Sequence, residues 1–188
     1  MVSGILRYYV KKLRITPNID KKCVQITVYS DSKNVEIHLL HHVYKVRGNE
    51  EITIPIDDPI LWSPENPHLY YFVVKTEDDE VKSYFAMRKF STIVDARGFR
   101  RLALNNKPYF MKGVLDQGYY RLGGLTPSSD ADYISDINTM KELGFNTLRK
   151  HIKIESLRWY YHCDRLGMIV WQDFVNGGST YKFQILSF

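Results

Sequence analysis

Hydrophobic and polar residues alternate along the first half of the chain. The alternation runs through five segments, at residues 23–30, 34–43, 51–56, 68–76 and 82–90. In the first of these, Val24, Ile26 and Val28 fall on one face of an extended chain. Clusters of turn-forming residues separate the segments, and this combination indicates antiparallel β-strands. About seven short strands within residues 1–92 predict an immunoglobulin-like β-sandwich.

From about residue 93 the periodicity changes to that of alternating strands and helices. Residues 107–114 form a short apolar stretch that predicts a strand. Residues 128–144 predict a helix, with Ser128 or Ser129 as its N-cap and Gly144 at its end. Its apolar stripe consists of Ile134, Ile137, Met140 and Leu143. A strand at 145–149, a second helix from Glu155 to Leu166 and a strand at 168–172 complete the pattern.

The sequence LGFNTLR at 143–149 is repeated in outline as LGMIVWQ at 166–172. Each copy is a helix end, a glycine and an apolar strand, which is typical of βα units in a parallel sheet. Three strands are too few for a closed eight-stranded barrel. The change of periodicity near residue 93 predicts two domains, a β-sandwich over 1–92 and an α/β domain over 93–188.

Polar residues follow each predicted strand of the second domain. Because functional groups of parallel α/β folds gather at the carboxyl ends of the strands, we expect these residues to meet on one rim. The residues concerned are Asp116 and Gln117 after the first strand, Arg149, Lys150 and His151 after the second, and Gln172 and Asp173 after the third.

Composition excludes several classes of protein. The 26 basic residues are scattered, so the net charge of +5 does not indicate a nucleic-acid-binding arm. No apolar run approaches the length of a membrane span, and the N-terminal stretch lacks a signal-peptide core. Cys23 and Cys163 have neither disulfide nor metal spacing, and we expect buried free thiols and favour a cytoplasmic location. His38, His41 and His42 are expected to face outward from a strand. We expect no metal and no cofactor.

Several longer motifs make the chain recognisable. It resembles glycoside hydrolase family 2, the β-galactosidase, β-glucuronidase and β-mannosidase family. LWSPENPHLY at 61–70 is similar to the signature of that family's immunoglobulin-like domain. GFRRLALNNKPYFMKGVLDQ at 98–117 resembles the segment that enters its barrel. MKELGFNTLRKHIKIE at 140–155 and YYHCDRLGMIVWQDFVNGG at 160–178 resemble the second and third barrel strands with their preceding helices.

The resemblance implies an immunoglobulin-like domain followed by the first three βα units of an incomplete (β/α)8 barrel. The family's reaction is retaining hydrolysis of a β-linked sugar by two carboxyl groups about 5–5.5 Å apart. In the family these are glutamates at the ends of the fourth and seventh barrel strands, which this chain does not contain. We therefore expect part of an exo-β-glycosidase that is inactive by itself and has no catalytic residue. Its expected partners are the remainder of the barrel and the sugar, with no nucleic acid and no membrane.

The resemblance also implies roles for residues on the rim. Arg149 would lie on the barrel floor and orient the nucleophile, because a guanidinium binds a carboxylate with two hydrogen bonds. Asp173 would shape the sugar subsite. Trp171 is either a stacking platform for the sugar ring or a core residue. The full set of expected substrate-binding residues is Arg149, His151, Asp116, Gln117, Trp171, Asp173 and Asn176.

Glu155 begins the second predicted helix, where a carboxylate is favoured by the helix dipole, so we interpret it as a capping residue.

The alternative function is a non-catalytic module that binds a carbohydrate or a protein partner. Exposure of Tyr70, Tyr71 or Tyr84 on one face of the sandwich would favour that alternative. The tail at 179–188 departs from the family's continuation, which suggests a premature end.

Overall fold

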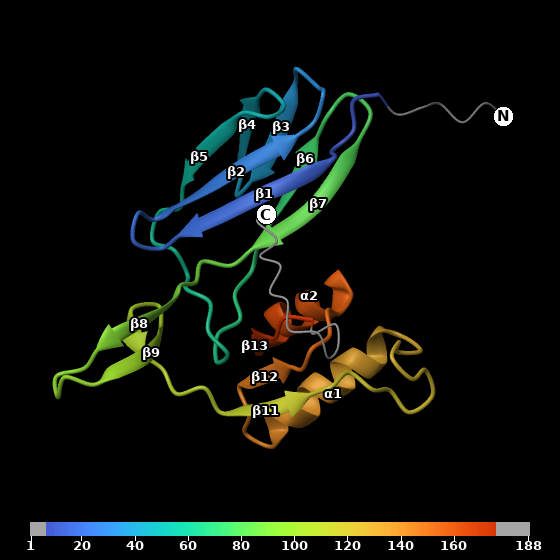
Figure 1. The fold of residues 1–188 in the computed structure, drawn as a ribbon. Helices are drawn as coiled ribbons and strands as arrows, with labels where there is room; N and C mark the ends of the chain where they lie inside the picture. Colours follow the sequence, from blue (N-terminus) through green and yellow to red (C-terminus); the bar gives the residue numbers. More distant parts are fainter. Residues whose placement is uncertain (1–6, 176–188) are drawn as a thin grey trace, which may run out of the picture. The chain divides into compact units, whose positions relative to one another are not determined.

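The computed structural model describes residues 7–175. The chain divides into two compact units, Met1–Phe110 and Met111–Phe188. Most of the described elements are β-strands, and the described part of the second unit also contains two α-helices (Figure 1). The expectation of a β-rich chain with a few helices is confirmed.

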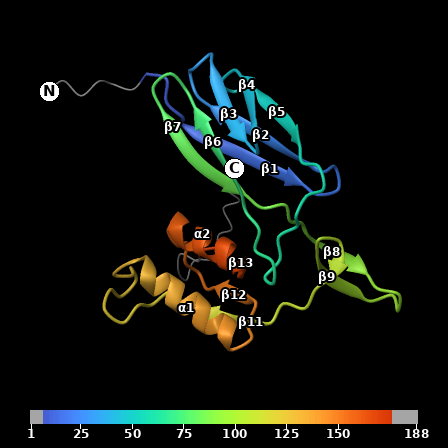
Figure 2. The same ribbon diagram turned by 180° about the vertical axis from the view of Figure 1, so that it is seen from behind.

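The first unit contains two antiparallel sheets that form a sandwich (Figures 1 and 2). One sheet has the strand order β1-β2-β5, with bounds Lys12–Asn18, Cys23–Tyr29 and Glu51–Pro55. The other has the order β4-β3-β6-β7, with bounds His42–Val46, Val35–Leu39, Tyr70–Lys75 and Glu80–Phe85. This arrangement is typical of immunoglobulin-like domains.

The core of the sandwich follows the alternation in the sequence. Val24, Ile26 and Val28 of β2 are fully buried, and each faces the second sheet because successive side chains of a strand point to opposite faces. The other fully or almost fully buried members come from β3, β5, β6 and β7 and the positions just after them: Val35, Ile37, Leu39, Ile54, Ile56, Phe72, Val74, Phe85 and Met87.

The predicted strand at 34–43 is in fact a hairpin. β3 ends at Leu39, and the chain turns at Leu40, which has a φ of 51°, before β4 begins at His42. The prediction of one strand was wrong because the alternation continues through this short turn. His38 lies on the outer face of β3, where its Nε2 is 3.1 Å from the Oε2 of Glu36.

A third small sheet follows the sandwich. It consists of β8 (Phe90–Val94), β9 (Arg100–Leu104) and β10 (Lys107–Pro108), paired in the order β10-β9-β8. These strands group with the first unit, whose division from the second falls after Phe110. The boundary expected between residues 92 and 93 stays a prediction. The predicted strand at 107–114 was wrong, since its first two residues belong to β10 and its last two begin β11.

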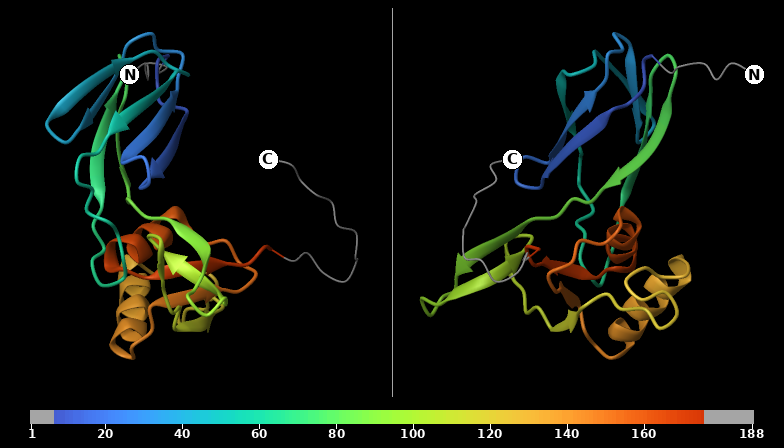
Figure 3. Two further views of the ribbon diagram at one scale, coloured as in Figure 1. Left: turned by 90° about the vertical axis from the view of Figure 1, so that its left-hand side faces the viewer. Right: turned by 45° about the vertical axis from the view of Figure 1, so that its right-hand side comes forward.

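The second unit contains a three-stranded parallel sheet with the order β11-β12-β13 (Figure 3). Its strands are β11 (Gly113–Asp116), β12 (Thr147–Lys150) and β13 (Ile169–Gln172). The helices α1 (Asp130–Glu142) and α2 (Leu157–Leu166) connect them. A core joins the sheet to the helices, and its buried members are Tyr120, Tyr133, Ile137, Leu148, Trp159, Cys163 and Met168.

Helix α1 begins with a capping box. The Ser129 hydroxyl accepts a hydrogen bond from the Ala131 N–H, and the Asp132 carboxylate accepts from the Ser129 N–H. The predicted cap is confirmed, but the predicted stripe needs correction. Leu143 is 66% exposed, whereas Tyr133 is buried beside Ile137. Leu143 is the C-cap residue, just beyond the last residue of the helix.

Helix α2 begins at Leu157, with Ser156 as its N-cap residue, and ends at Gly167 in the left-handed conformation. The predicted end is confirmed. The predicted start at Glu155 and its capping role were wrong, because Glu155 precedes the N-cap and its buried carboxylate binds lysines instead.

Candidate functional site

The register of the parallel sheet determines which polar side chains lie on each face. Leu115, Arg149 and Trp171 are opposite one another across β11, β12 and β13. The next row consists of Asp116, Lys150 and Gln172. Because side chains alternate along a strand, these two rows point to opposite faces. Val114, Leu148 and Val170 pack in the core with the helices, so the row of Lys150 faces the helices and the row of Arg149 faces away from them.

The row that faces away from the helices is open to solvent. Arg149 has a 57% exposed side chain, and Trp171 is 50% exposed. Trp171 is therefore not a core residue of the described unit, and its ring is accessible for stacking on a flat ligand. A sheet face that combines a guanidinium, an indole and the apolar Leu115 can bind a sugar ring through both stacking and hydrogen bonds.

Asp173 lies directly after β13, next to Arg149. The Arg149 Nε donates to both carboxylate oxygens of Asp173, at 3.1 Å and 3.2 Å. This hydrogen bond, helped by the nearby His151 and the Ile152 N–H, holds the pKa of Asp173 below its usual range. Asp173 is therefore an ionised acceptor at the carboxyl end of the sheet, suited to hydrogen bonds from hydroxyl groups.

The other expected site residues are His151, Gln117, Asp116 and Asn176, and they lie in different surroundings. His151 is half-buried. Its backbone N–H donates a hydrogen bond to the Asp116 carbonyl oxygen at 2.8 Å, which places the residue at the end of β11. Gln117 is exposed just after that strand. Asp116 faces the helices, where it pairs with Lys150 at 2.7 Å. Asn176 lies outside the described residues, as does the tail at 179–188.

The structure also contains a charged cluster that sequence reasoning missed. Lys150 is completely buried on the helix side of β12, between Asp116 and Glu155. Lys153 pairs with the same Glu155 oxygen at 2.7 Å. The signal for this arrangement was the spacing of two residues between Leu148 and Lys150, which puts both on the buried face of one strand.

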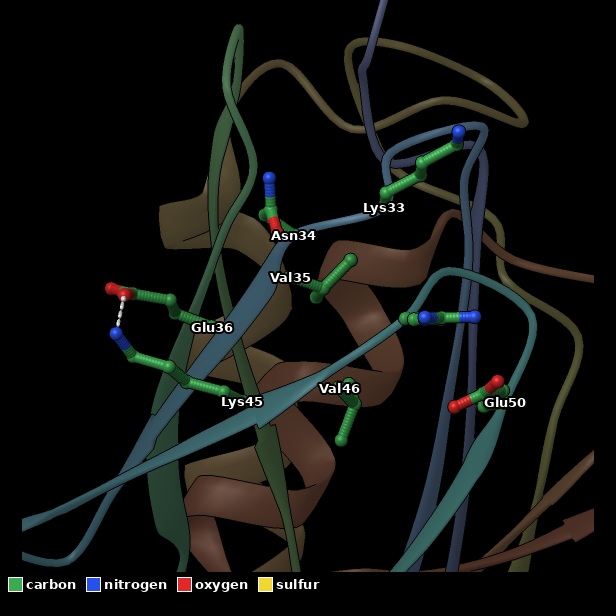
Figure 4. A pocket seen from close by; sticks show the side chains of 8 residues that line it. Lys33, Asn34, Val35, Glu36, Lys45, Val46 and Glu50 are labelled. Carbon is green, nitrogen blue, oxygen red and sulfur yellow. Dashed lines mark ion pairs between the residues drawn. The ribbon is translucent and has the colours of Figure 1, made fainter.

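A separate hollow of about 590 Å³ lies in the first unit, between the start of β3 and the end of β4 (Figure 4). Charged side chains line it, and the dashed line in Figure 4 marks the ion pair between Glu36 and Lys45, at 3.5 Å. His38 and Lys45 hold the pKa of Glu36 below its usual range. The Glu36 carboxylate is therefore already paired with neighbouring side chains. We regard the end of the parallel sheet as the stronger candidate for a ligand-binding site.

Two further features bear on the class of protein. Within residues 7–175, no three side chains of His, Cys, Asp or Glu lie together in a way that could hold a metal ion. In the same range, neither helix has the length and apolar character that crossing a membrane requires.

The comparisons with known proteins agree with this architecture. Residues 8–88 match the family model described as "Glycosyl hydrolases family 2". Residues 95–183 match the model described as "Glycosyl hydrolases family 2, TIM barrel domain". The two matches follow one another along the chain and leave only its ends and a short connection unmatched.

Several curated relatives are β-galactosidases. The protein of Leuconostoc mesenteroides is 31% identical over 121 residues, which is 64% of this chain and 12% of that protein. The protein of Enterobacter cloacae is 34% identical over 129 residues, covering 63% of this chain and 12% of that protein. The protein of Lactococcus lactis is 28% identical over 165 residues, covering 86% and 15%. The chain thus spans less than a fifth of the length of these relatives.

Solved structures show the same fold. A β-glucuronidase of Faecalibacterium prausnitzii aligns with 87% of this chain and 27% of its own, at a TM-score of 0.74 and 23% identity. A β-D-glucuronidase of Dictyoglomus thermophilum aligns with 94% of this chain and 31% of its own, at a TM-score of 0.77 and 18% identity. With two consecutive domain matches to one family, the chain belongs to glycosyl hydrolases family 2.

Proposed function

We propose that this chain is part of a retaining exo-β-glycosidase of the β-galactosidase type, which hydrolyses O-glycosidic bonds. In this proposal, residues 1–92 are the immunoglobulin-like domain. Residues 93–188 are the first three βα units of a (β/α)8 barrel that further chain completes. The observation that carries the proposal is the parallel sheet whose carboxyl ends bring together Arg149, His151 and Asp173.

The rim supplies binding groups for a sugar. Asp173 accepts hydrogen bonds from sugar hydroxyls, and His151 lies beside it. Trp171 stacks against the apolar face of the ring, since aromatic side chains bury large flat surfaces. Arg149 orients carboxylates, first Asp173 and, in the complete barrel, the nucleophile as well. Gln117, Asp116 and Asn176 complete the proposed set at the edge of the site.

The chain alone is proposed to be inactive. A retaining mechanism needs two carboxyl groups about 5–5.5 Å apart, one ionised as the nucleophile and one protonated as the acid. Asp116 and Glu155 both pair with Lys150, and Asp173 pairs with Arg149. Each of these carboxylates is therefore bound to a cation, which suits an acceptor and opposes service as a general acid.

A direct test compares two polypeptides. One is the 188-residue chain, and the other is the product of the whole reading frame, found by sequencing the DNA on both sides. Both are assayed with 4-nitrophenyl β-D-galactoside, β-D-glucuronide and β-D-mannoside. We expect hydrolysis only by a longer product. Hydrolysis by the 188-residue chain would show that it contains its own carboxyl pair, and a longer product without activity would refute the glycosidase assignment.

A second candidate function is a non-catalytic carbohydrate-binding module. The observation that favours it is Tyr71, which is 59% exposed on the outer face of the four-stranded sheet, opposite Tyr84 of β7. Tyr70, in contrast, faces the core. Calorimetric titration with oligosaccharides, with and without Tyr71→Ala, separates the two functions: this candidate requires binding that the substitution abolishes, without release of free sugar.

A further inference from the structure

The cluster beneath the rim is built around a buried lysine. Lys150 is 0% exposed, and its Nζ lies 2.7 Å from the Asp116 Oδ2 and 3.1 Å from the Glu155 Oε1. The same Nζ is 4.2 Å from the centre of the Trp159 ring. An unpaired charge removed from water is strongly unfavourable, so this lysine depends on both carboxylates and on the ring. The cluster therefore joins the ends of β11 and β12 to helix α2.

A second lysine extends the cluster to the loop after β11. Lys153 Nζ lies 2.7 Å from the Glu155 Oε1 and donates to the carbonyl oxygens of Gly118 and Leu125, at 2.8 Å and 2.6 Å. Gly118 has a φ of 67°, and a Cβ there would be 2.4 Å from the Glu155 Oε1. The loop therefore packs so closely against the Glu155–Lys153 ion pair that only glycine fits at position 118.

The backbone next to the candidate binding residues is attached to this cluster. The His151 N–H donates to the carbonyl oxygen of Asp116, at 2.8 Å. The Asp173 N–H donates to the carbonyl oxygen of Lys150, at 3.1 Å. Two members of the cluster therefore determine where His151 and Asp173 stand.

The backbone directly after His151 is strained. Ile152 has a φ of 44°, a left-handed conformation that β-branched residues rarely adopt. Such a conformation persists only where its surroundings enforce it, and it occurs often at functional sites. Its neighbour Lys153 provides that restraint through three interactions: the Glu155 ion pair and the two carbonyl contacts.

We propose that Lys150, Glu155 and Lys153 are positioning residues of the sugar site. They fix the segments 116–125 and 150–155 relative to each other, so that His151 and Asp173 stand at the carboxyl end of the sheet. For its catalytic meaning this proposal rests on the glycosidase function proposed above. Glu155, whose sequence position suggests a capping role, acts only through the groups that it holds.

The test uses the polypeptide at the length its gene encodes, with the isosteric variant Glu155→Gln. This variant keeps the shape of the side chain but removes the charge that holds both lysines. The matched control is Asp130→Asn, which removes an ion pair between α1 and α2, where Asp130 lies 3.0 Å from Arg158 and 3.2 Å from His162. This control touches neither segment.

We expect Glu155→Gln to accelerate hydrogen exchange of backbone amides in residues 117–125 about tenfold, which is more than any acceleration within α1. At a temperature where both variants are fully folded, kcat/KM for an aryl β-glycoside should fall about 100-fold, because small misplacements of binding groups are costly. Asp130→Asn should change neither quantity. A purely structural role of Glu155 predicts unchanged activity at that temperature.

Two results would overturn the proposal. One is unchanged exchange of residues 117–125 in Glu155→Gln. The other is faster exchange together with wild-type kcat/KM. If the wild-type polypeptide hydrolyses no aryl glycoside, the glycosidase function fails instead, and the exchange comparison still decides whether Glu155 holds the loop.

Discussion

Replacement of Lys150 by methionine tests the energetic role of the buried cluster. Methionine preserves most of the side-chain volume against Trp159 but removes the charge between Asp116 and Glu155. Breaking a buried ion pair by removing one partner costs about 3–5 kcal/mol, because it leaves a charge uncompensated. Glu155 retains its contact with Lys153, and Asp116 is partly exposed. We therefore expect a loss near the lower limit, about 3 kcal/mol.

Urea denaturation measures this loss, with unfolding of the second unit monitored by hydrogen exchange of peptides from α2. With a slope of about 2 kcal/mol per molar urea, the midpoint should fall by about 1.5 M. The matched control is Lys11→Met, which breaks the exposed pair with Asp31. Exposed pairs contribute little, so the control should leave the unfolding midpoint of its own unit unchanged.

A double-mutant cycle with Glu155→Gln identifies the cause. If Lys150 and Glu155 stabilise the unit through each other, the double variant should lose less than the sum of the single losses, by about 1–3 kcal/mol. Additive losses would refute the ion-pair argument. A loss for Lys150→Met no greater than that of the exposed control would refute it as well, and Lys150 would then be an ordinary buried aliphatic chain.

Three further predictions follow from the second unit. Ser129→Ala removes the N-cap of α1 and should cost about 1 kcal/mol of stability, measured by urea denaturation. Gly118→Ala should cost about 2 kcal/mol or more, since it adds a clash to the left-handed strain, whereas Gly144→Ala meets nothing within 4 Å and should cost only about 1 kcal/mol. Arg149→Met should raise the pKa of Asp173 toward its ordinary value, observable by NMR titration of the carboxyl. Because the folded-state pKa is depressed, the stability that the pair contributes is present above the unfolded pKa and is lost as the pH falls, and this acid-side loss should diminish in the variant.

The sandwich was accessible from sequence because strands such as β3 and β6 bury the side chains of one face and leave those of the other face more exposed. Period-two patterns such as Val24, Ile26 and Val28 then report directly on the core. The hairpin at 34–46 was missed, since the alternation is compatible with both one long strand and two short ones. What decides between them is the turn at Leu40, whose positive φ no residue preference of leucine indicates.

The location of the candidate site was also accessible, because it follows from strand order. Arg149 and Asp173 were expected on one rim, and they are hydrogen-bonded there. The direction of each side chain was harder to predict, since strands of parallel sheets are usually apolar on both faces and their sequences alternate only weakly. The run Arg149, Lys150, His151 therefore reads as one basic cluster, although Lys150 faces the helices and Arg149 faces away from them.

Glu155 shows why local rules fail at such a site. A carboxylate just before a helix favours a capping interpretation on local grounds alone. Two lysines pair with the same carboxylate, and the buried one lies between this carboxylate and Asp116. Because desolvation strengthens a charge–charge interaction, these buried ion pairs are favoured over a capping contact with helix α2. Sequence spacing gives no access to this outcome until the register of β11 and β12 is known.

The distribution of charges across the sheet connects these points. On the helix side, Asp116 and Glu155 neutralise Lys150, which would otherwise be unable to remain buried. On the opposite side, Asp173 neutralises an arginine that is open to solvent. The first set therefore stabilises segments, and the second remains accessible to a ligand. We infer that these three carboxylates, each paired with a cation, serve positioning and binding in the proposed glycosidase, and that bond cleavage depends on other carboxyl groups.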